Sequence, residues 1–394
     1  MDALMLPLNW QRVRLGDIAE IIGGGTPSTQ ITSFWNGSIN WFTPTEIGIT
    51  KYVYKSQRTI TPLGLKKSSA KLLPIGTILL TSRASIGDCA ILKVVATTNQ
   101  GFQSLIPLEK INNEFLYYLM LTLKNKLLKL ASGSTFLEVS PNKIKNLLIP
   151  LPPLNEQIAI ANILSDVDHY LYSLDALILK KESVKKALSF ELLSQRKRLK
   201  GFNQAWKKVR LGDIAEIKRG VRITKNELDV FGKYPVVSGG VGFLGYTNNF
   251  NRYENTITIA QYGTAGYVNF QKNKFWANDI CFCIYPNKDI IKNIFLYYFL
   301  KVNQNYLYEI SNRNATPYSI SKDKILDFKI PLPPLNEQIA IANILSALDN
   351  EIISLKNKKR QFENIKKALN HDLMSAKIRV LKNKRPKSQG QTRL

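Results

Sequence analysis

Residues Ile149–Ser165 read IPLPPLNEQIAIANILS, and Ile330–Ser346 repeat this stretch without a change, 181 positions later. A second pair of matching stretches opens each half of the chain: Trp10–Ile21 reads WQRVRLGDIAEI, and Trp206–Ile217 reads WKKVRLGDIAEI. Between these frames the two halves share little. Matched frames around unmatched centres indicate a division of labour, in which the frames contact the same thing twice and the centres contact two different things.

The composition indicates a globular, strongly basic protein. The chain has 394 residues, of which 44% are hydrophobic, and this is enough for two or three domains with cores of their own. The formal net charge of +26 favours a polyanionic partner, with nucleic acid ahead of a membrane surface. No apolar run approaches the roughly 18–20 residues that span a bilayer, and the N-terminus lacks the pattern of a signal peptide. We therefore expect a cytoplasmic protein.

Residues able to form disulfides or bind metals are scarce. Cys89, Cys281 and Cys283 are too few and too unevenly spaced for a disulfide framework or a zinc site. The only histidines of the sequence are His169 and His371, and both lie in segments with helical periodicity. Each is expected on a helix surface rather than in a catalytic or metal site. Metal-hydrolase chemistry built on histidine is therefore excluded.

Catalytic signatures are mostly missing as well. Gly23–Ser28 reads GGGTPS, which lacks the lysine of a phosphate-binding loop, and a structural turn is favoured over a backbone that approaches DNA. The Asp/Asn/Ser-Pro-Pro-aromatic tetrapeptide of amino-methyltransferases is absent. Glu216–Lys218 (EIK) resembles the end of a nuclease motif, but no paired aspartate stands at a suitable spacing. The sequence therefore predicts no catalytic acid, base or nucleophile.

Each copy of the long repeat is expected to open a long helix. Its prolines hold the preceding backbone extended, and Asn155 or Asn336 can then cap the first turn. Beyond that point apolar residues recur every three or four positions over about four heptads, which predicts a coiled-coil seam. Four of the eighteen seam positions are lysines, so the seam is imperfect; these are Lys181, Lys185, Lys359 and Lys366.

The predicted fold class is α+β: two mixed α/β globular domains separated by two long antiparallel coiled-coil helices, with an internal pseudo-two-fold repeat. Shorter helices are expected over residues 114–130 and 291–308. In an alternative fold each long helix packs only on its own globular region. The antiparallel pair is favoured because a domain between the helices lets the second one return. The expected boundaries are a first domain at 1–153, a spacer helix at 154–200, a second domain at 201–334, a spacer helix at 335–375 and a basic, disordered tail at 376–394.

Binding signatures are better represented than catalytic ones. Both centres mix basic residues with aromatic and amide side chains, which are the types that contact phosphates and base edges in DNA. Any one of these residues is more often a solvated surface residue, so they are informative only as a group. The candidate DNA-contact residues are Lys51, Tyr54, Lys66, Lys67, Ser82, Arg83, Asn99 and Gln100 in the first half, and Lys218, Arg219, Arg222, Lys225, Tyr246, Asn248, Gln261, Tyr262 and Arg313 in the second half.

Together these features resemble the specificity subunits of type I restriction–modification systems. Two copies of IPLPPLNEQIAIANIL, each after a variable region and before a long helix, are similar to that family over residues 10 to about 375. The first half, with GGGTPS and Thr81–Gly87 (TSRASIG), is similar to one common class of target-recognition domain. The second half has Lys218–Val221 (KRGV) and Gln261–Gly266 (QYGTAG) at those places and resembles a different class.

The resemblance implies a protein that reads a bipartite, asymmetric duplex DNA sequence, with one half-site for each recognition domain. It implies two modification subunits, which methylate adenine with S-adenosylmethionine, docked on the repeats, and motor–restriction subunits that use ATP and magnesium. No catalytic residue, metal or bound cofactor is expected on this chain itself. The docking residues that the resemblance implies are Leu154, Asn155, Glu156, Gln157, Leu335, Asn336, Glu337 and Gln338.

Three other interpretations remain open at this point. A methyltransferase or nuclease fused to a recognition module is disfavoured by the missing motifs. A basic scaffold that binds RNA or a membrane would share the charge, and competition between duplex DNA and RNA would separate it from the main interpretation. A specificity-type subunit that works with a methyltransferase alone is distinguished by nothing in the sequence.

Overall fold

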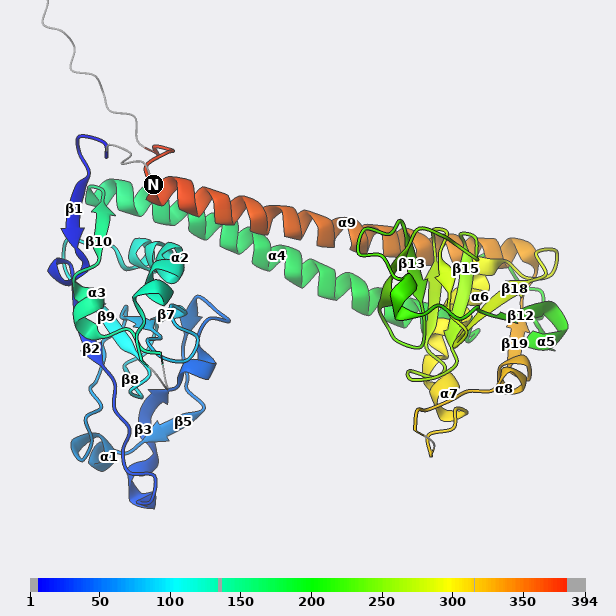
Figure 1. The fold of residues 1–394 in the computed structure, drawn as a ribbon, viewed down its shortest axis with the longest axis horizontal. Coiled ribbons are helices and arrows are strands. Elements are labelled where there is room, and N and C mark those ends of the chain that lie inside the picture. Colours follow the sequence, from blue (N-terminus) through cyan, green and yellow to red (C-terminus); the bar gives the residue numbers. More distant parts are fainter. Residues whose placement is uncertain (1–5, 134–136, 315, 381–394) are drawn as a thin grey trace, which may run out of the picture. The chain divides into compact units, whose positions relative to one another are not determined.

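The chain forms two compact units, and both halves of the sequence contribute to each of them. Unit 1 comprises residues 1–174 and 358–394, and unit 2 comprises residues 175–357. Figure 1 shows the elements of the computed structural model along the chain. The residues that the structure describes are 6–133, 137–314 and 316–380.

Two helices of 40 residues each, α4 (Leu154–Leu193) and α9 (Leu335–Met374), are shared between the units. The first part of α4 and the last part of α9 belong to unit 1, and the remaining parts belong to unit 2. Both helices begin at the same residue of the repeat, Leu154 in one copy and Leu335 in the other. The first spacer helix ends at Leu193 rather than at residue 200.

Unit 1 contains three sheets and three short or medium helices. A two-stranded ribbon joins β1 to β10, a five-stranded sheet has the order β2-β9-β6-β7-β4, and a three-stranded sheet has the order β5-β3-β8. The elements are β1 (Gln11–Arg14), β2 (Ala19–Gly23), β3 (Trp35–Phe42), β4 (Tyr52–Val53), β5 (Arg58–Ile60), α1 (Pro62–Lys66), β6 (Ile78–Leu80), β7 (Cys89–Leu92), β8 (Ala96–Thr98), β9 (Gln103–Pro107), α2 (Asn113–Leu130), α3 (Pro141–Lys145) and β10 (Leu148–Leu151), with short 3-10 turns at Leu15–Asp17, Thr32–Phe34 and Pro44–Glu46.

Unit 2 repeats this plan with one strand fewer in the larger sheet. Its ribbon joins β11 to β19, its larger sheet has the order β12-β18-β15-β16, and its smaller sheet has the order β14-β13-β17. The elements are β11 (Lys207–Arg210), α5 (Leu211–Ile214), β12 (Ala215–Arg219), β13 (Tyr234–Val237), β14 (Phe243–Thr247), β15 (Thr256–Ala260), β16 (Val268–Gln271), β17 (Trp276–Ala277), β18 (Cys281–Pro286), α6 (Asn293–Val302), α7 (Gln304–Glu309), α8 (Lys322–Leu326) and β19 (Lys329–Leu332), with a 3-10 turn at Lys225–Glu227.

The two frame stretches of each half pair with each other. Val13 faces Ile149 in the β1–β10 ribbon, and Val209 faces Ile330 in the β11–β19 ribbon, both in antiparallel register. In each half, the ribbon therefore brings the two ends of the centre together, and its second strand leads directly into a long helix. The predicted helix at 291–308 is divided, because α6 ends at Val302 and α7 starts anew after Asn303.

The long helices start differently from the prediction. Asn155 lies inside the first turn rather than before it, and its Oδ1 accepts a hydrogen bond from the neighbouring Glu156 N–H (3.0 Å). The carbonyl of Pro153 accepts the N–H groups of Glu156 and Gln157 instead, at 2.9 and 3.0 Å. Asn155 and Asn336 are therefore not N-caps, because they lie inside the helices; each accepts the N–H of the glutamate that follows it, and the proline carbonyl accepts the N–H of the glutamine.

The predicted antiparallel pairing is confirmed within each unit, and the seam lysines take part in it. In unit 2, Lys181 lies 2.7 Å from Glu351, and Lys185 lies 2.5 Å from Asp349. In unit 1, Lys366 forms an ion pair with Asp168. Three of the four lysines that interrupt the apolar seam are thus matched to a carboxylate on the opposite helix, and the fourth, Lys359, lies 3.6 Å from Glu363 on its own helix.

Each copy of the long repeat buries one carboxylate near the start of its helix. Glu156 and Glu337 are both 1% exposed. Trp10 Nε1 donates a hydrogen bond to Glu156 (3.1 Å), and Trp206 Nε1 donates one to Glu337 (2.9 Å). A buried carboxylate without a cation costs several kcal/mol, so the two indole donors do not suffice on their own.

The required cation comes from the segment that follows the other long helix. In unit 1, Arg379 Nε donates to Glu156 Oε1 at 2.8 Å, and in unit 2, Arg198 Nη2 donates to Glu337 Oε2 at 2.7 Å. The start of each long helix is thereby tied to the end of the other. We call these two arrangements, Trp10–Glu156–Arg379 and Trp206–Glu337–Arg198, the end locks.

The same chain reversal brings both arginines into place. Two positions after the last residue of each helix the backbone is left-handed, at Gln195 with φ 62° and at Ala376 with φ 58°. After α9, the Lys377 N–H donates to Asp372 O five residues back (2.9 Å), which is the bond of a Schellman-type helix end. At both ends a further bond spans six residues, from Lys197 N–H to Glu191 O (3.1 Å) and from Ile378 N–H to Asp372 O (3.2 Å).

The predicted disordered tail is wrong in its first residues. Arg379 forms the end lock of unit 1, and Ala376 and Val380 pack against the core of that unit. The remainder of the predicted tail, 381–394, lies outside the described residues. Composition pointed to a solvated tail because a single arginine that pairs with a distant buried carboxylate leaves no local pattern.

The end locks predict a local loss of stability. We expect Arg379→Ala to destabilise the start of α4 by about 3 kcal/mol, because the charge of Glu156 stays buried without its cation. Hydrogen exchange of the backbone amides of residues 154–165 measures this effect. Arg198→Ala should do the same to residues 335–346. The control is Arg196→Ala, whose guanidinium only lies over the Phe190 ring; equal effects of Arg196→Ala and Arg198→Ala would contradict the end lock.

Candidate nucleic-acid interface and the repeated helix faces

Most of the predicted DNA-contact residues of the first half lie on the surface of unit 1. Lys66 ends α1, and Lys67 follows it directly. The N-terminus of this short helix is fixed by Thr61, whose hydroxyl accepts the Gly64 N–H at 3.0 Å. The exposed members of the set are Tyr54, Lys66, Lys67, Arg83 and Gln100, whereas Asn99 is half-buried.

Two predicted contact residues of unit 1 are turned inward. Ser82 is 1% exposed, and its hydroxyl donates to Gly101 O (3.2 Å). The Lys51 ammonium donates to Tyr118 OH (2.9 Å) and pairs with Glu114 (2.5 Å), with 11% of its side chain exposed. Both side chains therefore make contacts inside unit 1. The prediction that Ser82 and Lys51 contact DNA is wrong for this reason.

The glycine-rich stretch at residues 23–28 is a tightly packed turn. A Cβ atom added at Gly24 would lie 2.0 Å from the carbonyl oxygen of Asn99. Trp41 Nε1 donates to the carbonyl of Gly25 (2.9 Å), and Thr26 Oγ1 donates to the side chain of Gln100. Close backbone approach explains the glycine here, which agrees with the structural-turn interpretation.

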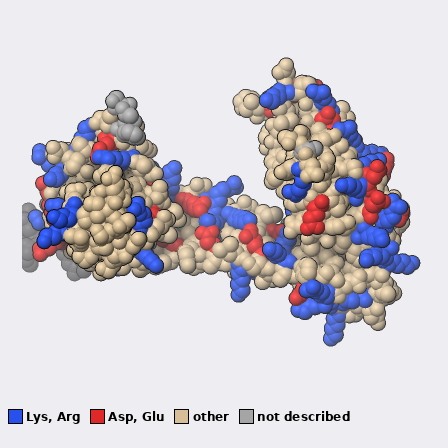
Figure 2. Space-filling model, turned by 90° about the horizontal axis from the view of Figure 1, so that it is seen from below, with Lys and Arg blue, Asp and Glu red and all other residues tan. Residues whose placement is uncertain are grey.

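The predicted residues of unit 2 are also mostly exposed. Several already have partners: Lys218 pairs with Glu216 (3.1 Å), Arg219 Nε donates to Asp279 O (2.5 Å), and Asn248 donates to Asp229 (2.6 Å). The exposed residues are Lys218, Arg219, Arg222, Lys225, Tyr246, Asn248 and Arg313, and the half-buried ones are Gln261 and Tyr262. Lys and Arg side chains outnumber Asp and Glu on the faces shown in Figure 2.

Four of the eight predicted docking residues are buried. Glu156 and Glu337 belong to the end locks. Gln157 and Gln338 fix the first turn of α2 and α6: Gln157 Oε1 accepts the Asn112 N–H (2.9 Å), and Gln338 Oε1 accepts the Lys292 N–H (2.7 Å). These four residues cannot contact a partner directly, because they are at most 1% exposed.

The same identical segment also has an exposed side. Asn155, Ile158 and Asn162 are exposed on α4, and the corresponding Asn336, Ile339 and Asn343 are exposed on α9. Ile158 is 42% exposed and Ile339 is 44% exposed. Their spacing of three and four residues places each trio on one helix face. We call them the repeated faces; among the predicted docking residues, Leu154 is exposed beside the first face, and Leu335 is half-buried beside the second.

In each unit a tyrosine of α2 or α6 reaches the paired helices. Tyr118 OH donates to Asp168 (2.6 Å), and Tyr298 OH donates to Asp349 (2.7 Å). Burial, aided by the neighbouring carboxylate, raises the pKa of both hydroxyls above the usual value of a tyrosine. They therefore stay protonated donors at neutral pH and attach each domain to an ion pair of the seam.

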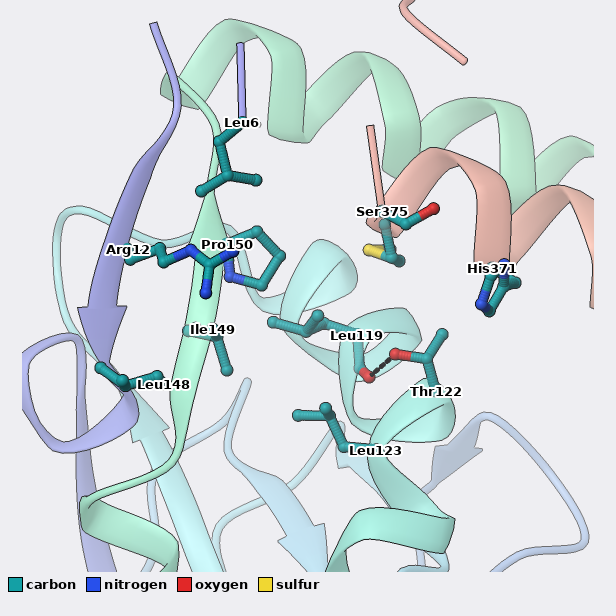
Figure 3. Close-up of a pocket in the computed structure, with 11 residues that line it drawn as sticks. Leu6, Arg12, Leu119, Thr122, Leu123, Leu148, Ile149, Pro150, His371 and Ser375 are labelled. Atoms are coloured by element: carbon teal, nitrogen blue, oxygen red, sulfur yellow. Dashed lines mark hydrogen bonds between the residues drawn. The ribbon is translucent and has the colours of Figure 1, made fainter. Parts of the chain in front are cut away.

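A cavity of about 320 Å³ in unit 1 has no side-chain chemistry that would support a reaction site. Figure 3 shows it between the β1–β10 ribbon, α2 and the end of α9. Its described lining contains neither a carboxylate nor a thiol, and the hydroxyl of Thr122 donates to Leu119 O (2.7 Å). His371 lines it from α9 but is exposed and lies beside Asp372.

The cysteine side chains are shielded from solvent. Cys89, Cys281 and Cys283 are all buried and unpaired. Burial raises the pKa of the Cys89 thiol to about 12, so almost none of it is thiolate at neutral pH. Among the described residues, no group of three His, Cys, Asp or Glu side chains could hold a metal ion. In the same part of the chain, no helix is long and apolar enough to cross a membrane.

The geometry thus defines a class of protein: two structurally similar but chemically different domains, each fixed to a paired helix through identical contacts. A family model described as "Type I restriction modification DNA specificity domain" matches residues 7–181 and again residues 203–364. The chain belongs to this family and carries two copies of its domain.

Curated relatives agree with this assignment. The chain is 34% identical over 247 residues to the type I restriction enzyme MjaIX specificity subunit of Methanocaldococcus jannaschii, covering 58% of this chain and 56% of that protein. It is 37% identical over 161 residues to the EcoR124I/EcoR124II specificity subunit of Escherichia coli, covering 39% and 40%. The chain thus spans about half the length of these relatives, whereas the putative MjaX specificity subunit of M. jannaschii aligns at 29% identity over 95% of both chains.

Solved structures share the fold. The S subunit of a type I restriction–modification system from M. genitalium superposes with a TM-score of 0.65 at 21% identity, covering 94% of this chain and 97% of that one. The HsdS subunit of Thermoanaerobacter tengcongensis gives a TM-score of 0.53 at 18% identity, covering 96% and 99%. Two tandem α/β domains with long helices are therefore a recurring architecture.

Sequence reasoning missed Arg198 and Arg379. They stand 181 positions apart, like the repeat itself, but they lie outside the identical segment. Extending the same offset beyond Ser165 would have shown that both helices are followed by an arginine at the same place. Only part of the exposed side of the repeat was predicted to dock a partner, because Ile158 and Asn162 looked like ordinary helix residues.

The exposed lysine pair of α1 gives a test of the nucleic-acid surface. We expect Lys66→Ala with Lys67→Ala to weaken binding to all duplex DNA sequences to a similar degree and to lower the slope of log affinity against log salt by about one to two, because two phosphate contacts would be lost. Anisotropy titrations over a salt series measure this. Lys207→Ala with Lys208→Ala removes the same charge from the exposed side of β11 and serves as the control. A changed sequence preference at an unchanged slope would contradict a phosphate role.

Proposed function

We propose that this chain is the DNA specificity subunit of a type I restriction–modification complex. Each unit would bind one half of a bipartite, asymmetric duplex DNA target. The observation that carries the proposal is the contrast within the chain: the long frame segment is identical in both halves and the opening frame segment differs only at Gln11/Lys207 and Arg12/Lys208, whereas the centres differ in sequence, in sheet size and in surface side chains. Two unlike centres suit two unlike half-sites.

The repeated faces are the proposed docking sites for two copies of one partner. The buried residues of the identical segment are explained by packing, since Ile160, Ala161 and Leu164 belong to the core of unit 1. Asn155 also accepts the Glu156 N–H at the start of α4, but the exposed Ile158 and Asn162 have no such internal reason to recur. We take the partner to be a modification subunit that methylates adenine, as the resemblance implies, with motor–restriction subunits joining the full complex.

The chemistry would reside in those partners. They would supply S-adenosylmethionine, ATP and magnesium, while this chain recognises the sequence and holds the subunits in place, working in the cytoplasm. The long helices are proposed to act as the spacer between the two half-sites. The buried tyrosine contacts support this role, because they attach each recognition domain to one position along its helix pair.

Exchange of one centre tests the proposal. We expect replacement of residues 22–148 by the matching region of another family member to change one half-site and to leave the other intact. The β1–β10 ribbon and both end locks stay in place, since their residues lie outside the exchanged segment apart from Leu148. Methylation-sensitive sequencing of DNA from cells that carry the exchanged chain and the modification subunit reads out both half-sites. If both half-sites changed, independent reading by the two units would be disproved.

A further inference from the structure

Unit 2 exposes two neighbouring apolar side chains on one turn. Val230 is 90% exposed and Phe231 is 94% exposed. They follow the 3-10 turn at Lys225–Glu227 and precede strand β13. Two adjacent apolar residues that are almost fully bare are unusual on a folded surface, where such groups are stabilised by burial. Their exposure therefore needs a reason outside the unit itself.

The turn that carries them is built to hold its shape. Asp229 N–H donates to Tyr246 O (2.8 Å), and Asp229 Oδ1 accepts the Phe231 N–H (2.8 Å). Asn248 donates to the other carboxylate oxygen of Asp229 (2.6 Å). Gly232 presses against strand β14 so closely that a Cβ atom there would lie 2.5 Å from Thr247 N. These contacts therefore hold the apolar pair at a fixed place before any partner binds.

Basic residues border the same turn. Lys233 comes two residues after Phe231 and lines a groove of about 490 Å³ together with Lys272 and Lys274. Lys274 lies over the rings of Phe250 and Tyr253, with distances of 4.5 and 5.4 Å to the ring centroids. One carboxylate, Glu254, also lines the groove. The groove lining therefore carries three ammonium groups against one carboxylate, while Asp229 keeps its own negative charge beside the pair.

A bare apolar pair next to a lysine-lined groove suits duplex DNA. Proteins insert apolar side chains between base steps and place cations on the neighbouring phosphates, and the larger protein surface that the bent duplex then covers offsets the cost of unstacking. Charged residues are depleted at the buried centre of a protein–protein interface, and lysine in particular is depleted there. The three lysines therefore favour a polyanion over a protein as the occupant.

We propose that Val230 and Phe231 form an apolar wedge that enters a groove of the DNA bound by unit 2, while Lys233, Lys272 and Lys274 hold the adjacent phosphates. This inference rests on the proposed function and adds a contact that the earlier set of polar candidates lacks. The wedge adds affinity through shape and stacking, and it favours base steps that unstack easily.

Photo-cross-linking tests the contact directly. The full chain carries benzoylphenylalanine in place of Phe231, is assembled with its modification subunits, and is irradiated on an end-labelled duplex that contains the target. We expect the label to be transferred to the chain from the half-site of unit 2. The control places the same group at Ile365, which is 50% exposed on α9 and should give no DNA adduct. Cross-linking of position 231 to a modification subunit, or to neither partner, would overturn the wedge.

Binding measurements provide a second test of the wedge. Val230→Ala with Phe231→Ala should weaken target binding roughly tenfold to hundredfold, as the loss of base stacking does, with an unchanged salt slope. Lys233→Ala with Lys274→Ala should instead lower the slope by about one to two. If the wild-type complex showed no preference for a target, the proposed function would fail. If it bound its target and the apolar variant bound equally well, only the wedge would be disproved.

Discussion

One buried carboxylate in each unit constrains how this chain can fold. Glu156 and Glu337 are out of reach of water at the starts of the long helices, and each needs a cation to offset its desolvation. Arg379 and Arg198 supply that cation from beyond the end of the opposite helix. Neither unit is therefore complete until both long helices have formed and paired, which is why each compact unit combines residues from both halves of the sequence.

The pairing of the two long helices also separates the residues that have structural contacts from the residues whose identity can vary. Within the identical segment, the glutamate holds the opposite helix, the glutamine holds the first turn of α2 or α6, and the apolar residues fill the core. The tyrosine of α2 or α6 adds a further attachment through Asp168 or Asp349. The centres join this framework through a few backbone and side-chain contacts, so their outer surfaces can differ without disturbing it.

Much of this architecture could be predicted from the sequence. The repeat with its apolar period indicated the two long helices, because helix periodicity is a local property, and the domain between them indicated that they run antiparallel. The seam lysines were misjudged, because a cation such as Lys366 on one helix is explained only by a carboxylate such as Asp168 on the other. Arg379 was placed in a solvated tail, since its partner stands 223 residues away in the sequence.

The candidate site was less predictable than the fold. Composition identified basic and polar candidates, most of which are exposed, but Ser82 and Lys51 point inward, and no sequence pattern distinguishes an inward lysine from an outward one. Val230 and Phe231 were overlooked for the opposite reason: apolar residues are expected in a core, and only three-dimensional placement shows that these two are bare.

Two identical faces would bind two copies of the same partner. Native mass spectrometry of the chain assembled with its modification subunit can test this proposal, because it counts the bound subunits. We expect two subunits on the natural chain, one on Ile158→Asp or Ile339→Asp, and none on the double variant, while Ile365→Asp keeps two. Loss of both subunits from a single variant, or retention of both by the double variant, would contradict it.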